Sequence, residues 1–89
     1  MMYPYIKLAD ETEITHSHII NNNNLQEIEV HFERPTENGF DMARCSLPSY
    51  KWLMCEGYSQ NEIVEFELIL RNHAHLLFKY AGSGGINIA

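Results

Sequence analysis

The amino-acid sequence predicts an α+β domain in which a four-stranded antiparallel β-meander packs against one long C-terminal α-helix. Before Pro48, short stretches that alternate between polar and apolar residues are separated by turn-forming residues, which is typical of antiparallel strands. After Ser59, apolar residues recur at the spacing of an amphipathic helix. A chain of 89 residues has room for one hydrophobic core, so residues 1–89 are expected to form a single domain.

The first two strands are expected in the amino-terminal quarter of the chain. A strand over residues 3–8 places Ile6 on the apolar side of the sheet and Tyr5 on the opposite side. The next turn falls within the asparagine run 21–24, where several loop lengths fit because asparagine tolerates the left-handed backbone region. We take Asn22–Asn23 as its centre, which fixes the register between the second strand and the third.

A second hairpin is indicated by Asn38–Gly39, a dipeptide that favours the positive φ angles of a type I′ turn. If these are the two loop residues, the third and fourth strands present one wholly apolar face and one polar face. The expected cross-strand pairs are Phe32 with Cys45, Val30 with Leu47, and Glu33 with Arg44.

The segment that joins the sheet to the helix, residues 49–57, allows two interpretations. Its serine start at Ser49 and its glycine stop at Gly57 favour one or two helical turns before the long helix. An extended strand is the alternative.

The long helix is expected to begin at Ser59, which forms a capping box with Glu62, and to end at Gly82. At about 100° per residue, its apolar residues form one broad arc that covers the sheet. The arc contains Ile63, Phe66, Ile69, Leu70, Ala74, Leu76, Leu77, Tyr80 and Ala81. In the tail, alternating Ile86 and Ile88 predict a short strand at the edge of this sheet or of a neighbour's.

Charge and cysteine content narrow the classes of partner. Twelve acidic and six basic side chains give a net charge of −6, and the basic residues are scattered singly, so we expect no direct contact with nucleic acid. The amino terminus lacks a signal core, and no apolar run is long enough for a membrane span. Cys45 and Cys55 show no paired spacing, which suits buried thiols in a reducing compartment. We therefore expect a cytoplasmic protein.

One group of residues has the chemistry of a metal site. With the asparagine turn centred as above, histidine and glutamate side chains of the second and third strands share the polar face of the sheet. Imidazoles and carboxylates together suit zinc or another divalent first-row metal. The candidate ligands are His16, His18, Glu27, Glu29 and His31. No cofactor is otherwise expected.

A second group of residues has the chemistry of a protein interface. Val64, Leu68 and Phe78 fall on the side of the long helix that faces away from the sheet, where apolar side chains favour a covering partner. Trp52 lies in the joining segment, outside the predicted sheet, where an aromatic side chain is well placed to contact a partner.

Three functions are consistent with these features. The leading hypothesis is a non-enzymatic interaction or oligomerisation module, with a homodimer as the expected assembly, because the sequence has no phosphate loop, nucleophile elbow or cysteine metal cluster. The alternative is a metal- or small-ligand-binding protein that uses the histidine and glutamate face, with hydrolytic activity if a metal keeps an open position. A third hypothesis is an acidic, antitoxin-like protein that neutralises a basic partner.

Overall fold

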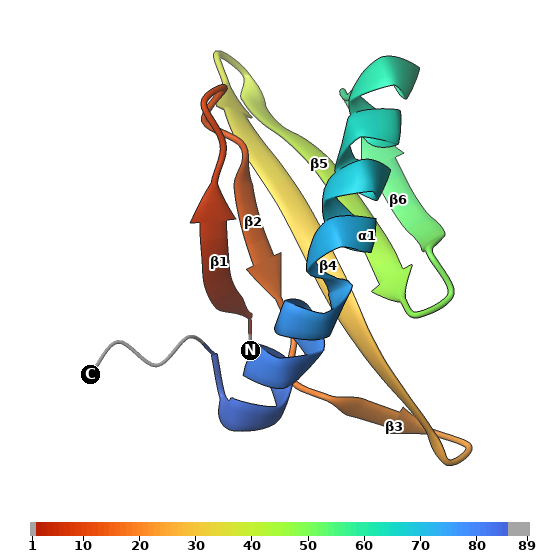
Figure 1. Cartoon of the computed structure of the whole chain (residues 1–89). Coiled ribbons are helices and arrows are strands. Elements are labelled where there is room, and N and C mark those ends of the chain that lie inside the picture. The colour runs from red at the N-terminus through yellow and green to blue at the C-terminus, as the bar shows by residue number, and fades with distance from the viewer. Residues whose placement is uncertain (1, 86–89) are drawn as a thin grey trace.

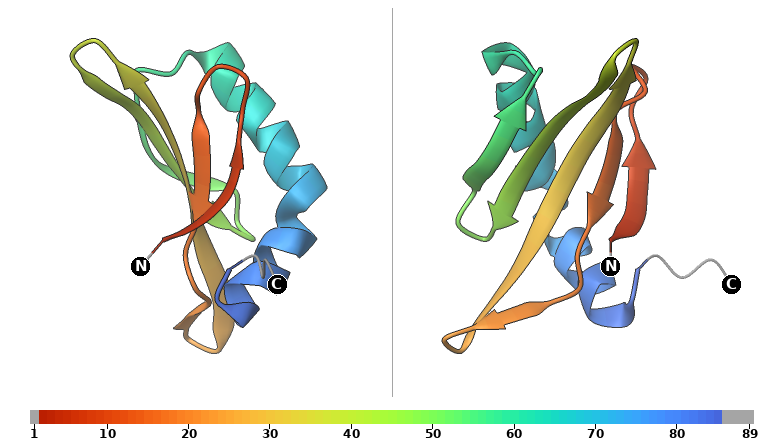
Figure 2. Two further views of the ribbon diagram at one scale, coloured as in Figure 1. Left: turned by 90° about the vertical axis from the view of Figure 1, so that its left-hand side faces the viewer. Right: turned by 180° about the vertical axis from the view of Figure 1, so that it is seen from behind.

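The computed structural model describes residues 2–85 and confirms the α+β class: an antiparallel sheet of six strands carries one helix on one face (Figures 1 and 2). The elements are β1 (Tyr3–Lys7), β2 (Glu13–His16), β3 (Ile20–Asn22), β4 (Leu25–Thr36), β5 (Gly39–Leu47), β6 (Lys51–Glu56) and α1 (Gln60–Ser83). Five strands lie in the order β1-β2-β4-β5-β6, and β3 pairs with the beginning of β4. The predicted count of four is too low because the second predicted strand is divided into β2 and β3, and because β6 is extended.

The β4–β5 hairpin turns one residue earlier than predicted. Its loop residues are Glu37 and Asn38, and Gly39 is the first residue of β5. Paired positions therefore shift by two residues, which leaves side chains on their predicted faces because the period of a strand is two. The predicted pairs are replaced by Val30 with Cys45, Ile28 with Leu47, Phe32 with Ala43, Glu33 with Met42, and His31 with Arg44.

The asparagine run forms the turn between β3 and β4, one residue later than its predicted centre. Asn23 and Asn24 are the loop residues, with φ angles of 51° and 66°, so both occupy the left-handed region that a type I′ turn requires. This shift also moves the register by two residues. This two-residue shift alone would have left each side chain on its predicted face of the sheet.

A bulge between β2 and β3 inverts the faces of β2. The three residues Ser17–Ile19 lie opposite only two residues of β4, so the register changes by one residue between β3 and β2. Ser17 supplies two hydrogen bonds to β4 at the bulge. Its backbone N–H donates to the Glu29 carbonyl at 2.9 Å, and its hydroxyl accepts from the Glu29 N–H at 2.9 Å. A slip of one residue exchanges the two faces of a strand. Ile14 and His16 therefore point toward the helix, contrary to prediction.

The first strand has a bulge of its own, between Pro4 and Ile6. Ile6 lies opposite Ile14, on the predicted side of the sheet, although its edge position leaves it exposed. Tyr5 is the extra residue. It packs against the core on the helix side, so the prediction for Tyr5 is wrong because the bulge interrupts the alternation of β1.

The joining segment forms the edge strand β6, so the extended alternative is confirmed and the helical interpretation is wrong. β6 pairs with β5 along its whole length, with Met42 opposite Glu56 and Ser46 opposite Lys51. Gly57 then turns the chain toward α1 with a φ of 91°, and a Cβ at this position would overlap the Asp41 carboxylate. The glycine stop of the sequence marks the end of a strand, not of a helix.

The helix begins as predicted and ends two residues later. The Glu62 N–H donates to the Ser59 hydroxyl at 3.2 Å, and the Ser59 N–H donates to the Glu62 carboxylate at 3.0 Å, which completes the capping box. The left-handed residue that ends the helix is Gly84, at φ 81°, and not Gly82. The predicted tail strand at Ile86 and Ile88 lies outside the described residues.

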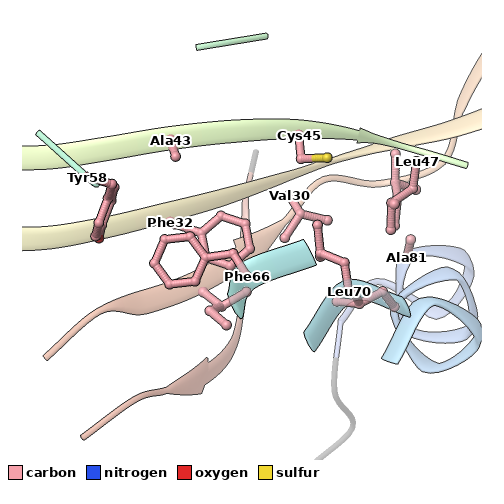
Figure 3. Packing of buried hydrophobic residues seen from close by; sticks show 12 residues of the cluster. Val30, Phe32, Ala43, Cys45, Leu47, Tyr58, Phe66, Leu70 and Ala81 are labelled. Atoms are coloured by element: carbon pink, nitrogen blue, oxygen red, sulfur yellow. The ribbon is translucent and has the colours of Figure 1, made fainter. Parts of the chain in front are cut away.

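The hydrophobic core lies in one layer between α1 and the sheet. Phe32 of β4 stacks on Phe66 of α1 with ring centroids 4.3 Å apart, and Tyr58 meets Phe66 edge-on at 4.8 Å (Figure 3). Within α1 the buried residues are Phe66, Leu70, Leu77 and Ala81, all from the predicted arc. No helix of the described chain has the length and apolar character needed to cross a membrane.

Candidate interaction surface

The bulge between β2 and β3 separates the members of the predicted metal site. His16 is completely buried on the helix side, opposite Val30 and not opposite Glu29 as predicted. Its Nδ1 donates to the Ser17 carbonyl at 2.9 Å, and its Nε2 has no partner within residues 2–85. The rings of Tyr3 and Tyr5 lie 5.6 and 6.3 Å away between centroids. His16 is thus enclosed by aromatic side chains of β1.

The other four candidate ligands are spread over the opposite face and the bulge. His31 Nε2 lies 3.1 Å from Glu29 Oε1, so these two residues are in contact. Glu27 is half-buried opposite Ile20, and His18 is exposed within the bulge. In the part of the chain that the structure describes, no three histidine, cysteine, aspartate or glutamate side chains gather closely enough to hold a metal ion. The five residues do not form one site.

The two cysteines differ in their surroundings. Cys45 is buried on the core face of β5, and this burial raises the pKa of its thiol to about 12, so the thiol is protonated at neutral pH. Cys55, in β6, is exposed, with its Sγ 3.7 Å from the Tyr58 carbonyl. The prediction of buried thiols is therefore right for Cys45 and wrong for Cys55, because Cys55 lies on an edge strand.

Two of the four predicted interface residues lie together on the outer side of α1. Val64 is 48% exposed and Leu68 is 58% exposed, and their spacing of four residues makes them neighbours on the helix surface. Phe78 differs from the prediction, because its side chain is partly buried against the core. The exposed apolar part of α1 is therefore confined to its amino-terminal half.

Trp52 lies inside the fold, on the helix side of β6. Its ring centroid is 5.8 Å from that of Phe32, and its Nε1 donates to Glu67 Oε1 at 3.4 Å. The expectation that Trp52 lies outside the sheet is wrong because its segment is a strand. Trp52 instead holds β6 against the amino-terminal half of α1.

One exposed residue beside this contact is missed by the sequence analysis. Leu53 of β6 is 49% exposed, and it is the extra residue where the β5–β6 register shifts between Arg44 and Cys45. The available signal was a run of apolar residues between Lys51 and Glu56, which is typical of a strand. We call the exposed residues Leu53, Val64 and Leu68 the β6–α1 surface.

A charged cluster at the amino-terminal end of α1 is also missed, because its members are far apart in sequence. Arg34 Nη1 donates to Glu62 at 2.6 Å and to Asp10 at 2.9 Å, and its Nη2 donates to Asp41 at 2.7 Å. The guanidinium also lies 4.7 Å from the centre of the Tyr58 ring. Arg34 thus connects the β1–β2 turn, β5 and the helix cap.

Two carboxylates of this cluster, Asp10 and Glu62, are stabilised in their charged form. The pKa of Glu62 is lowered by the Ser59 N–H first and by Arg34 second. Burial raises the pKa of Asp10, but hydrogen bonds from Thr12 and Arg34 outweigh it, and the net shift is downward. Arg34 and its carboxylate partners bond to one another, which is typical of a structural cluster.

Comparison with known proteins gives no match: no protein-family model fits the chain, and neither a curated protein nor a solved structure is significantly similar to it.

Proposed function

We propose that this protein is a non-enzymatic interaction module that self-associates, as a homodimer, through the β6–α1 surface. The observation that carries the proposal is the exposure of Val64 and Leu68, one helical turn apart, beside an edge strand that exposes Leu53. The Trp52–Glu67 contact ties these elements together, and Figure 1 shows the first turns of α1 crossing in front of β6. Exposed apolar side chains one helical turn apart, as Val64 and Leu68 are, favour coverage by another chain.

Several groups that could carry chemistry are engaged in structural contacts or buried, which supports a binding role. The Arg34 guanidinium is shared among three carboxylates. The Tyr5 hydroxyl and His73 Nδ1 are 2.6 Å apart. The Cys45 thiol is protonated at neutral pH because it is buried. We also propose that the protein acts in the cytoplasm, where the free thiols of Cys45 and Cys55 would remain reduced.

Native mass spectrometry of the untagged protein, purified without chelator, tests the proposal. We expect a metal-free dimer. Replacing Val64 and Leu68 together by serine should weaken self-association about tenfold or more, which corresponds to about 1.4 kcal/mol, and leave the far-ultraviolet circular dichroism unchanged.

The matched control is Leu25→Ser. Leu25 is 65% exposed at the tip of the β3–β4 hairpin, away from α1, so this variant should remain dimeric. An unchanged mass for the helix variant would count against the β6–α1 surface. A monomer that carries one bound metal ion would overturn the proposal and direct attention to Glu29 and His31.

A further inference from the structure

We infer that β6 is the dimerisation strand, pairing antiparallel with β6 of a second copy so that Lys51 of each chain lies opposite Glu56 of the other. This inference rests on the proposed self-association and names the contact that produces it. Three half-exposed aliphatic side chains offer little apolar area, and association also has to offset the lost freedom of two chains. Backbone hydrogen bonds along an edge strand would add a larger, directional contact.

The two edges of the sheet differ in their ability to accept another strand. Both edge strands contain a bulge, but at one edge β1 also contains Pro4, which has no N–H to donate to a neighbouring strand. At the other edge, β6 has six residues without proline, and within residues 2–85 no strand pairs with its outer side. Figure 2 shows that α1 covers one face of the sheet and leaves the β6 edge open.

The bulge in β6 places Lys51 and Glu56, the charged residues at the two ends of the strand, on the same face of the sheet. Lys51 lies opposite Ser46 and Glu56 lies opposite Met42, and both partners point away from the helix. Residues five positions apart in a regular strand point to opposite faces. The extra residue, Leu53, cancels this difference. Lys51 and Glu56 are therefore able to meet across an antiparallel pair, where directly opposed side chains share a face.

One antiparallel register pairs all six residues of β6 with those of a second copy. It sets Lys51 opposite Glu56, Trp52 opposite Cys55, and Leu53 opposite Met54, each pair occurring twice. Trp52 and Cys55 also share a face, because their partners in β5, Cys45 and Ala43, both point into the core. A slip of one residue would oppose side chains from different faces.

The charges at the ends of β6 are complementary between copies. Lys51 and Glu56 are exposed, and neither takes part in an ion pair within the described residues. In the paired register each Lys51 faces one Glu56 of the other copy, so one ion pair forms at each end of the seam. The two-fold axis is perpendicular to the sheet, so both helices lie on the same face of one continuous sheet, and Leu53 of each chain lies next to the axis.

Sedimentation equilibrium of the full chain tests the pairing at low ionic strength. Lys51→Glu and Glu56→Lys should each weaken dimerisation about tenfold or more, because two attractive pairs become two repulsive ones. The double variant, Lys51→Glu with Glu56→Lys, should restore the dimer to within about threefold of the original. The matched control is Lys7→Glu, which removes the exposed Lys7–Glu11 ion pair beside the other edge and should leave dimerisation unchanged.

The outcomes separate this inference from the proposed function. A dimeric parent with unaffected single variants would overturn pairing through β6 and leave the proposed self-association standing. Weakened single variants without recovery in the double variant would overturn this register. A parent chain that stays monomeric throughout would overturn both. Circular dichroism of each variant confirms that these exposed substitutions leave the fold intact.

Discussion

Each of the two edge strands contacts α1 through an aromatic side chain, but the strands differ in whether their backbone can pair with another strand. The Tyr5 hydroxyl of β1 contacts His73 at 2.6 Å, and the Trp52 indole of β6 donates to Glu67 at 3.4 Å. In β1 the backbone is interrupted by Pro4, whereas in β6 it runs without proline. The first edge is closed to further pairing, and the second is anchored through its side chain while its backbone stays available.

The positions of the attachments along α1 differ as well. The β1 side of the sheet is held at the amino-terminal end of α1, by Asp10 through Arg34 to Glu62, and near the middle of α1, by the Tyr5–His73 contact. The β6 side is held between these two points, by Trp52 at Glu67 and by Tyr50, next to β6, whose ring centre lies 4.4 Å from the Arg71 guanidinium. If β6 pairs with a second copy, that pairing supplies part of the stability of the β6 edge. Substitutions on the two sides should therefore have unequal effects on unfolding and on dimerisation.

The largest effect is expected from Trp52→Ala. The indole ring lies against Phe32 and bonds Glu67, so its loss leaves a cavity between β6 and α1. We expect the free energy of unfolding to fall by about 3 kcal/mol and dimerisation to weaken with it. Urea denaturation followed by circular dichroism measures the first effect. A loss below about 1 kcal/mol would show that β6 is held by other contacts.

A smaller loss is expected from Arg34→Met, which acts on the β1 side. The methionine keeps apolar contact with Tyr58 but leaves Asp10, Asp41 and Glu62 without their cation. These groups are partly exposed, so we expect a loss of about 2 kcal/mol in urea denaturation and no change in dimerisation. Dissociation of the dimer in this variant would contradict the separation of the two sides.

Tyr5→Phe should be milder still. It keeps the aromatic ring against Tyr80 and removes the hydroxyl that contacts His73. The net contribution of one such hydrogen bond is about 1 kcal/mol, and urea denaturation should show a loss of that size. Dimerisation, measured by sedimentation, should be unaffected. A loss as large as that of Trp52→Ala would remove the contrast between the two anchors.

The smallest expected effect is a decrease in the free energy of unfolding at acid pH. The pKa values of Asp10 and Glu62 are lower in the folded chain than their ordinary values, so the folded state favours the charged carboxylates. Their stabilisation is complete above the ordinary carboxyl range, around pH 4, and is lost as the pH falls through their folded values. Urea denaturation at about pH 5 and pH 3 should show this decline. Arg34→Met should show a shallower decline, and an identical one would contradict the role of Arg34.

Local patterns in the sequence predict much of this fold. The capping box of Ser59 and Glu62 marks the start of α1, and helical periodicity identifies both its buried arc and the exposure of Val64 and Leu68. The faces of β4 and β5 are also predicted, although the turn is misplaced by one residue. Errors of two positions in register do not change a face.

The bulges could not be predicted, and they decide the candidate sites. The extra residue at Ser17–Ile19 moves His16 into the core and divides the predicted metal site. The extra residue at Leu53 sets Lys51 and Glu56 on one face. A bulge is stabilised by long-range pairing and packing, which leave no local pattern in the chain. Arg34 was missed for the same reason, since its three carboxylates come from distant segments.

Amide hydrogen exchange at two protein concentrations tests the difference between the edges most directly. If β6 pairs with a second copy, amides of residues 51–56 should gain protection when the concentration is raised from about 1 μM to about 100 μM, and those of residues 3–7 should not. This result would assign self-association to the β6 edge. Concentration-independent exchange in β6, or a gain of protection confined to β1, would contradict it.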